Sequence, residues 1–460
     1  MYRGNSSNSS QGLWRGRGRW SSNWRGRGTA IRRGTSQAPK SVNDSPLGRI
    51  VAEITLGSVS SHGNQARDAK ITDCKYVASY SLVDSHSPKI IIPGQPATWK
   101  PPQLPSQLPG DYGDYLRDQN GARFPDHPMQ PSVQSLFALD KGFDPSSVDI
   151  MGCASSLGDI LRFTRLVEST FRFDVEMVGN TLFLIRNCRK EVIPDVRGYG
   201  HSFLDNFTSY QAGMEDTKSH QRIVSYSFGG LKCLVRFECD GHFADTTGGV
   251  APTASEPRIL KHSESLASSS IPIETAGATV SQQSILEIKT KSRARAPVDM
   301  NEHLPRLWLR QIPNLITAYH TGGNFAEVEE KAIQQDLLNW EREHELEVRK
   351  FASVLHQLIT EIKRAGHLKL ELCRTGLGPL ELREQKGGTR DVLPADWKDM
   401  WTGRSQEPTT DVEACLSDND DDDSYPSQKD RSSDSGGSDD DFSLDYTACD
   451  LSCGYCGHCG

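Results

Sequence analysis

The two ends of this chain cannot form a folded core, and they confine any globular fold to the residues between them. The first 40 residues contain eight arginines, one lysine and no acid, with six glycines between residues 12 and 34. After residue 404, fifteen acids stand against one lysine and one arginine. Sequence that is rich in glycine or in unbalanced charge disfavours regular structure and burial. We therefore predict disordered segments at 1–40 and 403–448, a Cys-rich tail at 449–460, and one folded domain over 41–402.

The central part of the chain carries the patterns of a mixed α/β domain. Hydrophobic residues are only 35% of the whole chain, which fits one large domain between polar ends. Alternating apolar residues predict strands at 49–56, 75–82, 171–178, 181–186, 230–238, 285–291, 314–320, 368–374 and 379–383. Helical spacing predicts helices at 157–166, at 301–312 with Asn301 as the cap, and over 326–364 with one break. We therefore expect an α/β (α+β) fold with a mixed central sheet, flanking helices and a low-complexity insertion at 246–283.

The basic head combines arginine, glycine and tryptophan in the way typical of RNA-binding segments. Its arginines in the glycine repeats are Arg15, Arg17, Arg19, Arg25 and Arg27. Guanidinium groups bind phosphates and stack on bases, and tryptophans supply further stacking faces. We predict that these arginines contact RNA. The alternative is a segment that only keeps the chain soluble.

Two short charged triplets lie at the ends of predicted strands. The first is Glu238-Cys239-Asp240, and the second is Glu287-Ile288-Lys289. Alternate residues of a strand point to the same face, so each triplet presents two charged groups together. If the strands are neighbours, three carboxylates and one ammonium converge, and such oxygen ligands suit Mg²⁺ or Mn²⁺. The alternative is an ordinary solvated face of a sheet.

The order of these and other motifs resembles the DXO-type decapping and exoribonuclease family of the PD-(D/E)xK nucleases. The resemblance covers roughly residues 48–400. Its motifs are the segment from Gly200 to Asp205, the two charged triplets with Thr290-Lys291-Ser292 after the second, Trp308-Leu309-Arg310-Gln311, and the segment from Ala318 to Thr321.

The resemblance implies a nuclease-like domain that acts on RNA 5′ ends with a divalent metal. It implies that the metal is held by Glu238, Asp240, Glu287, the carbonyl of Ile288 and a fourth carboxylate. It also implies that Lys289 and Gln311 position the attacking water. We therefore expect a metal-dependent RNA phosphodiesterase with Mg²⁺ or Mn²⁺ as cofactor and RNA as partner.

Three positions depart from the family pattern. Leu204 stands where the family has the fourth glutamate, and Asp205 follows one place later. Ala154 stands in place of a substrate-binding arginine, and His320 in place of an arginine in the last motif. These changes favour the rival hypothesis, a catalytically impaired nuclease fold that serves as an RNA-binding or interaction scaffold.

The chain also looks like a fungal family whose members are often labelled geranylgeranyl pyrophosphate synthetases, but its residues argue against that chemistry. Prenyl synthases grip Mg²⁺-diphosphate with aspartate motifs on the helices of an all-α bundle. Here the aspartate runs are at 420–423 and 439–441, in a Ser/Gly-rich segment with no helical pattern. We interpret these runs as a solvated acidic segment that offers a surface to a protein partner.

Four cysteines crowd into the last twelve residues, namely Cys449, Cys453, Cys456 and Cys459. Their spacing and the intervening glycines suit a Zn²⁺ site on a loop. Thiol chemistry and the absence of any site are the alternatives.

The sequence predicts neither secretion nor membrane insertion. The first 30 residues contain no apolar signal-peptide core, and no run of 18 apolar residues occurs. We expect a nuclear or cytoplasmic location.

Overall fold

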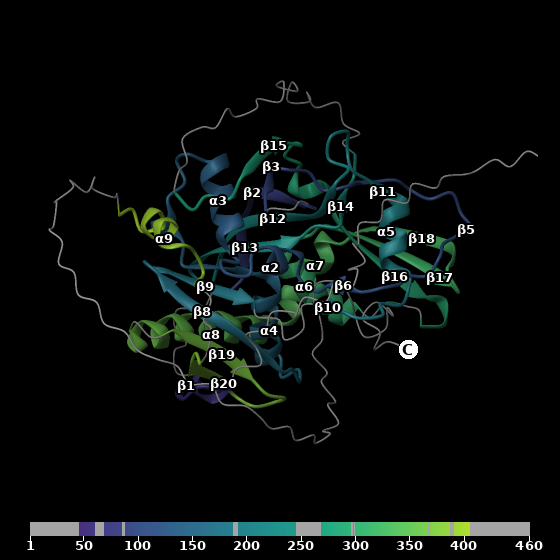
Figure 1. The fold of residues 1–460 in the computed structure, drawn as a ribbon. Helices are drawn as coiled ribbons and strands as arrows, with labels where there is room; N and C mark the ends of the chain where they lie inside the picture. Colours follow the sequence, from purple (N-terminus) through teal and green to yellow (C-terminus); the bar gives the residue numbers. More distant parts are fainter. Residues whose placement is uncertain are drawn as a thin grey trace, which may run out of the picture.

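The structure, a computed structural model, describes residues 46–59, 69–84, 88–186, 192–244, 268–295, 298, 300–366, 369–386 and 391–404. Over these residues the chain forms two large β-sheets with helices packed on them (Figure 1). The predicted mixed α/β fold is confirmed. The arginine-rich head, the acidic segment and the four clustered cysteines lie outside the described residues.

The first sheet has eleven strands and contains a parallel group of three at its centre. In spatial order the strands are β1 (Ile50–Ile54), β20 (Leu380–Glu384), β19 (Leu370–Arg374), β8 (Phe171–Val178), β9 (Thr181–Arg186), β7 (Ile150–Cys153), β13 (Leu231–Glu238), β12 (Thr217–Phe228), β2 (Ile71–Val83), β3 (Ile90–Pro93) and β15 (Ile273–Ala276). Strand β7 is parallel to both β9 and β13. The carboxyl ends of these three strands therefore meet at one edge of the sheet.

Helices cover both faces of this sheet, so the central strands are buried on both sides. On β13, Cys233, Val235 and Phe237 pack into one core and Leu234 into the other. The first core also takes residues from α4 (Ala154–Thr164), α6 (Met300–Arg310), α7 (Gln334–Glu343) and α8 (Glu345–Ala365). The second takes residues from α3 (Gln130–Leu139) and α9 (Ala395–Trp401). Figure 1 shows α8 and α3 on opposite sides of the sheet.

The second sheet has seven strands and joins the first at the end of β13. Its strands are β11 (Thr208–Ser209), β4 (Thr98–Trp99), β14 (Gly241–His242), β16 (Ile285–Ser292), β17 (Asn314–Thr321), β18 (Asn324–Ala332) and β5 (Ser106–Gln107), and α5 (Gly200–Phe207) packs on β16. The chain passes from β13 to β14 through only Cys239 and Asp240. Strand β14 pairs with β16, so the two charged triplets lie side by side where the sheets meet.

The first part of the predicted long helix is a strand. Residues 324–332 form β18, which pairs antiparallel with β17 through a turn at Gly322 and Gly323. Both glycines have positive φ, +57° and +83°, as a tight hairpin turn requires. This turn and the pairing with β17 outweigh the helix propensity of the charged residues. From residue 334 onward the prediction of helices with one break is confirmed by α7 and α8.

Two smaller features differ in detail from the sequence-based expectation. The insertion predicted at 246–283 contains β15, which extends the first sheet by pairing parallel with β3. Its low-complexity composition concealed a short edge strand, while residues 245–267 lie outside the described part. Helix α6 begins at Met300, so Asn301 lies within its first turn rather than at its cap. In the described ranges, no helix combines the length and the apolar character needed to cross a membrane.

Candidate functional site: a carboxylate cluster beside an arginine-lined cavity

Glu287, on β16, is buried and forms ion pairs with two cations. The guanidinium of Arg310 donates to both carboxylate oxygens, from Nη1 to Oε2 at 2.8 Å and from Nη2 to Oε1 at 3.1 Å. The ammonium of Lys289 lies 2.7 Å from Oε1. Burial alone raises the pKa of Glu287, but Arg310 and then Lys289 outweigh it and lower the pKa to about 2. Glu287 is therefore a charged and fully paired carboxylate.

Asp240 and Glu238 lie next to this pair and are less well compensated. Asp240 Oδ2 accepts the backbone N–H of Ile288 at 2.9 Å. Burial and then the charge of Glu287 raise the pKa of Asp240 to about 6. Burial and then the charge of Asp240 raise the pKa of Glu238 to about 7. The predicted neighbours Glu238, Asp240 and Glu287 thus form a chain of interacting carboxylates.

The other residues expected at the site have local partners. Gln311 follows α6 in a left-handed conformation, and its side-chain nitrogen donates to the carbonyl of Trp308 at 2.7 Å. Asp205 lies on α5, where its charge, after burial and Asp111, helps to raise the pKa of Tyr115 to about 12. His320, one of the departures from the family pattern, lies in the second sheet, where its ring packs near Tyr199.

The cluster in this arrangement does not fit a divalent metal. Within the described part of the chain, no group of three or more His, Cys, Asp and Glu side chains has the geometry to hold a metal ion. Both oxygens of Glu287 already accept hydrogen bonds or ion pairs from Arg310 and Lys289. Arg310 was not singled out from the sequence, because a basic residue in the last turn of a helix is common.

A cavity of about 420 Å³ opens at the carboxyl edge of the central parallel strands. Residues at or near the ends of β9, β7 and β13 contribute to it, and so do the first turn of α4 and one face of α6. Seven arginines line it, together with four acids. The arginines are Arg117, Arg162, Arg165, Arg186, Arg236, Arg306 and Arg310, and the acids are Asp118, Glu168, Glu238 and Glu302. The cavity therefore has an excess of positive charge, and Glu238 and Arg310 connect it to the carboxylate cluster.

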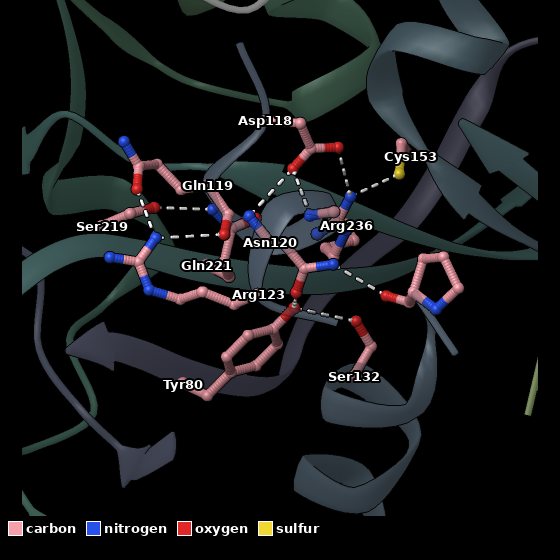
Figure 2. A network of polar contacts seen from close by, with 12 residues as sticks. Tyr80, Asp118, Gln119, Asn120, Arg123, Ser132, Cys153, Ser219, Gln221 and Arg236 are labelled. Carbon is pink, nitrogen blue, oxygen red and sulfur yellow. Dashed lines mark hydrogen bonds and ion pairs between the residues drawn. The ribbon is translucent and has the colours of Figure 1, made fainter. Parts of the chain in front are cut away.

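Arg236, on β13, is the most deeply buried of the seven arginines that line this cavity. It is 5% exposed, and its Nη2 lies 2.7 Å from the sulfur of Cys153 and 3.9 Å from Asp118 Oδ2 (Figure 2). Its Nε and Nη1 are enclosed by protein atoms and make no hydrogen bond of ordinary geometry. A buried guanidinium whose donors are incompletely satisfied is costly, and a negative charge nearby offsets part of that cost.

A polar network holds this arginine's carboxylate partner in place. Asp118 caps α2 (Gln119–Arg123) by accepting the N–H groups of Asn120 and Gly121, both at 2.9 Å. The buried side chain of Asn120 in turn accepts the hydroxyl of Tyr80 at 2.7 Å, and Figure 2 shows this network from α2 to β13. Asp118 and Arg236 are 118 positions apart, and neither was predicted, because no local motif links them.

Comparison with known families assigns the chain to one of them. The family described as "Domain of unknown function (DUF8563)" matches residues 60–370, about two thirds of the chain. The chain belongs to this family. No curated protein matches it.

Solved structures with a distantly similar fold include three of fungal Rai1. The mutant S. pombe Rai1 in complex with 3′-FADP is 15% identical with a TM-score of 0.45, and the match covers 75% of this chain and 98% of that one. Scheffersomyces stipitis Rai1 with (3′-NADP)+ and calcium ion is 11% identical, with a TM-score of 0.49 and coverages of 78% and 99%. Candida albicans Rai1 with pU5-Mn2+ is 11% identical, with a TM-score of 0.48 and coverages of 76% and 99%. These similarities are too distant to assign an activity.

Proposed function

We propose that this chain binds RNA and holds a terminal phosphate of it, at the 5′ end, in the arginine-lined cavity. The observation that carries the proposal is the excess of arginines around that cavity, among them the buried guanidinium of Arg236. A planar guanidinium matches two phosphate oxygens at once. A phosphate in the cavity would bring the negative charge that these arginines lack.

The rest of the cavity supports the same class of ligand. The seven arginines outnumber the four acids, so an anion gains Coulomb energy on entry. Leu161, Phe237 and Leu309 add apolar wall on which a base or sugar can pack. The volume of about 420 Å³ is that of a small-molecule site.

Helix α4 adds backbone donors at the same place. Its first residues, Ala154 and Ser155, line the cavity, and its cap residue Cys153 makes no side-chain capping hydrogen bond. The first N–H groups of a helix lack intrahelical partners and favour anions. Ala154 stands where the resembling family has an arginine, so the cavity wall has one cation fewer at this position. The backbone N–H groups at the start of α4 remain as donors.

The experiment compares two oligouridylates of equal length, one with a 5′-phosphate and one with a 5′-hydroxyl, by fluorescence anisotropy in EDTA. The full chain should prefer the phosphorylated strand. Arg236→Gln should remove most of that preference, by about 10- to 100-fold, because it removes charge-assisted hydrogen bonds. Arg306→Gln tests a second arginine of the same wall.

Arg364→Gln is the matched control, because this arginine of α8 is 71% exposed, lies outside the cavity lining and pairs with Glu361 on the same helix. It removes one charge outside the cavity and should keep the preference. Equal affinity of the wild-type chain for both strands would refute the proposal. Thermal unfolding of each variant separates a lost contact from a lost fold.

Metal-dependent hydrolysis of RNA is the second candidate. It is favoured by the raised pKa values of Asp240 and Glu238, since buried carboxylates that repel each other gain from an added cation. This candidate requires Arg310 to move away from Glu287, after which Glu238, Asp240, Glu287 and the carbonyl of Ile288 would hold Mg²⁺ or Mn²⁺. The metal would supply Lewis-acid stabilisation of the phosphodiester. Cleavage of RNA with Mn²⁺, and its loss in Glu238→Gln, would support this candidate; cleavage that persists in EDTA would exclude it.

A further inference from the structure

Arg310 lies where a cation would have to sit to neutralise the carboxylate cluster. Its guanidinium forms a two-pronged contact with Glu287 at 2.8 and 3.1 Å. The same group thus occupies both oxygens of one of the three carboxylates that the sequence pattern offered to a metal.

The geometry of α6 fixes this guanidinium in place. Arg310 is the last residue of the helix, is 7% exposed, and donates from Nε to the carbonyl of Arg306 at 3.2 Å. Two residues before it, Trp308 is buried and donates to Glu341 at 2.8 Å. All three guanidinium nitrogens of Arg310 have partners within the protein. Moving the side chain away would leave Glu287 buried beside the ammonium of Lys289.

We propose that Arg310 is a built-in replacement for a divalent cation, so that the wild-type cluster does not bind Mg²⁺ or Mn²⁺. Lys289 and Arg310 together place two positive charges on Glu287, the charge that one divalent ion would bring. Removing the guanidinium opens the oxygens of Glu287 beside Asp240, and oxygen ligands of this kind bind Mn²⁺. The inference is independent of the RNA proposal, because it concerns the ion alone.

The test measures free Mn²⁺ by electron paramagnetic resonance during titration of the full chain without RNA. The wild-type chain and Glu287→Gln should bind Mn²⁺ equally weakly. Arg310→Gln should gain one site, about tenfold tighter or more than any in the wild type. Arg310→Lys, which keeps a positive charge at this position, should gain none.

The double variant Arg310→Gln with Glu287→Gln should lose the new site, which would locate the ion at the cluster. A wild-type site that Glu287→Gln removes would overturn the proposal, and this result needs no variant at Arg310 that folds. A folded Arg310→Gln protein, verified by thermal unfolding, that gains no Mn²⁺ site would also overturn it. RNA binding in EDTA is measured separately, so failure of the RNA proposal would leave these outcomes readable.

Discussion

Asp159, on α4, shows how a single carboxyl group can act against the stability of this fold. It is partly buried among arginines, and burial raises its pKa to about 7, although Arg186, Arg162, Arg306 and Arg374 pull the pKa down. The ordinary value in an unfolded chain is roughly 3.9. The arginines that line the cavity therefore do not keep the carboxyl group of Asp159 fully ionised between pH 5 and pH 7.

The shift predicts a pH dependence with a definite sign. A carboxyl group with a raised pKa binds its proton more tightly in the folded state, so it stabilises the fold at low pH. That contribution should be lost as the pH rises from about 4 to about 7. Asp159→Asn removes this titration, so the variant should gain stability relative to the wild type between pH 5 and pH 8.

Urea unfolding at both pH values measures the difference in free energy of unfolding. Asp126→Asn, which changes an exposed aspartate in the loop after α2, is the control. If the difference between the wild type and Asp159→Asn stays constant over this range, the assignment is wrong.

At the scale of single elements, the sequence was sufficient for several strands whose pattern is local, although it missed β12. The two strands of the β8–β9 hairpin were predicted with their observed bounds, because their alternation lies within one short stretch. Strands β13 and β16 were predicted for the same reason, and the proximity of Glu238, Asp240 and Glu287 was predicted on the condition that these strands are neighbours. What failed was β18, where charged residues of high helix propensity pair with a neighbouring strand.

The candidate site could be predicted only in part, because its decisive contacts are not local. Arg310 meets Glu287 across 23 positions, and Arg236 meets Asp118 across 118. No spacing rule links a residue at the end of α6 to β16 or a helix cap to the middle of β13. These pairs depend on how the two sheets and α6 are packed, which the sequence alone does not give.

The Gly322–Gly323 turn provides a test of why β18 is a strand. Both residues have positive φ, so alanine at either position costs about 1 kcal/mol of strain. A Cβ at Gly322 would meet open space, whereas a Cβ at Gly323 would lie 2.6 Å from the carbonyl oxygen of Leu108 and 2.4 Å from Tyr199. We predict that Gly323→Ala lowers the free energy of unfolding clearly more than Gly322→Ala does.

Urea unfolding of the two variants measures this difference, and Gly322→Ala is the internal control because it shares the backbone strain without the clash. Equal losses would mean that the turn can shift away from Leu108 and Tyr199. The register of β17 and β18 would then be set by pairing rather than by the turn.

For the whole molecule, the proposal places two different kinds of RNA contact on one chain. The cavity offers a small, enclosed set of arginines to one phosphate, while the head at 1–40 carries eight arginines, one lysine and no acid. A single buried contact changes affinity strongly but releases few counterions. Many exposed contacts release many counterions and make binding depend on salt.

Deletion of residues 1–40 should therefore flatten the salt dependence of RNA binding while the preference for a 5′-phosphate remains. For single strands the slope of log K against log salt is about −0.7 for each phosphate contact, so loss of five contacts changes it by roughly 3.5. Arg236→Gln should do the reverse, removing the phosphate preference with a slope change of about 0.7 or less.

The matched control replaces five arginines of the head by lysine, namely Arg15, Arg17, Arg19, Arg25 and Arg27. This variant should keep the slope of the salt dependence, because the charge is unchanged. It should bind RNA more weakly, because lysine does not stack on bases. Anisotropy titrations between 50 and 200 mM salt measure the slope for each variant. In this range, the loss of about five phosphate contacts changes the affinity measurably. An unchanged slope after deletion would show that the head does not contact RNA.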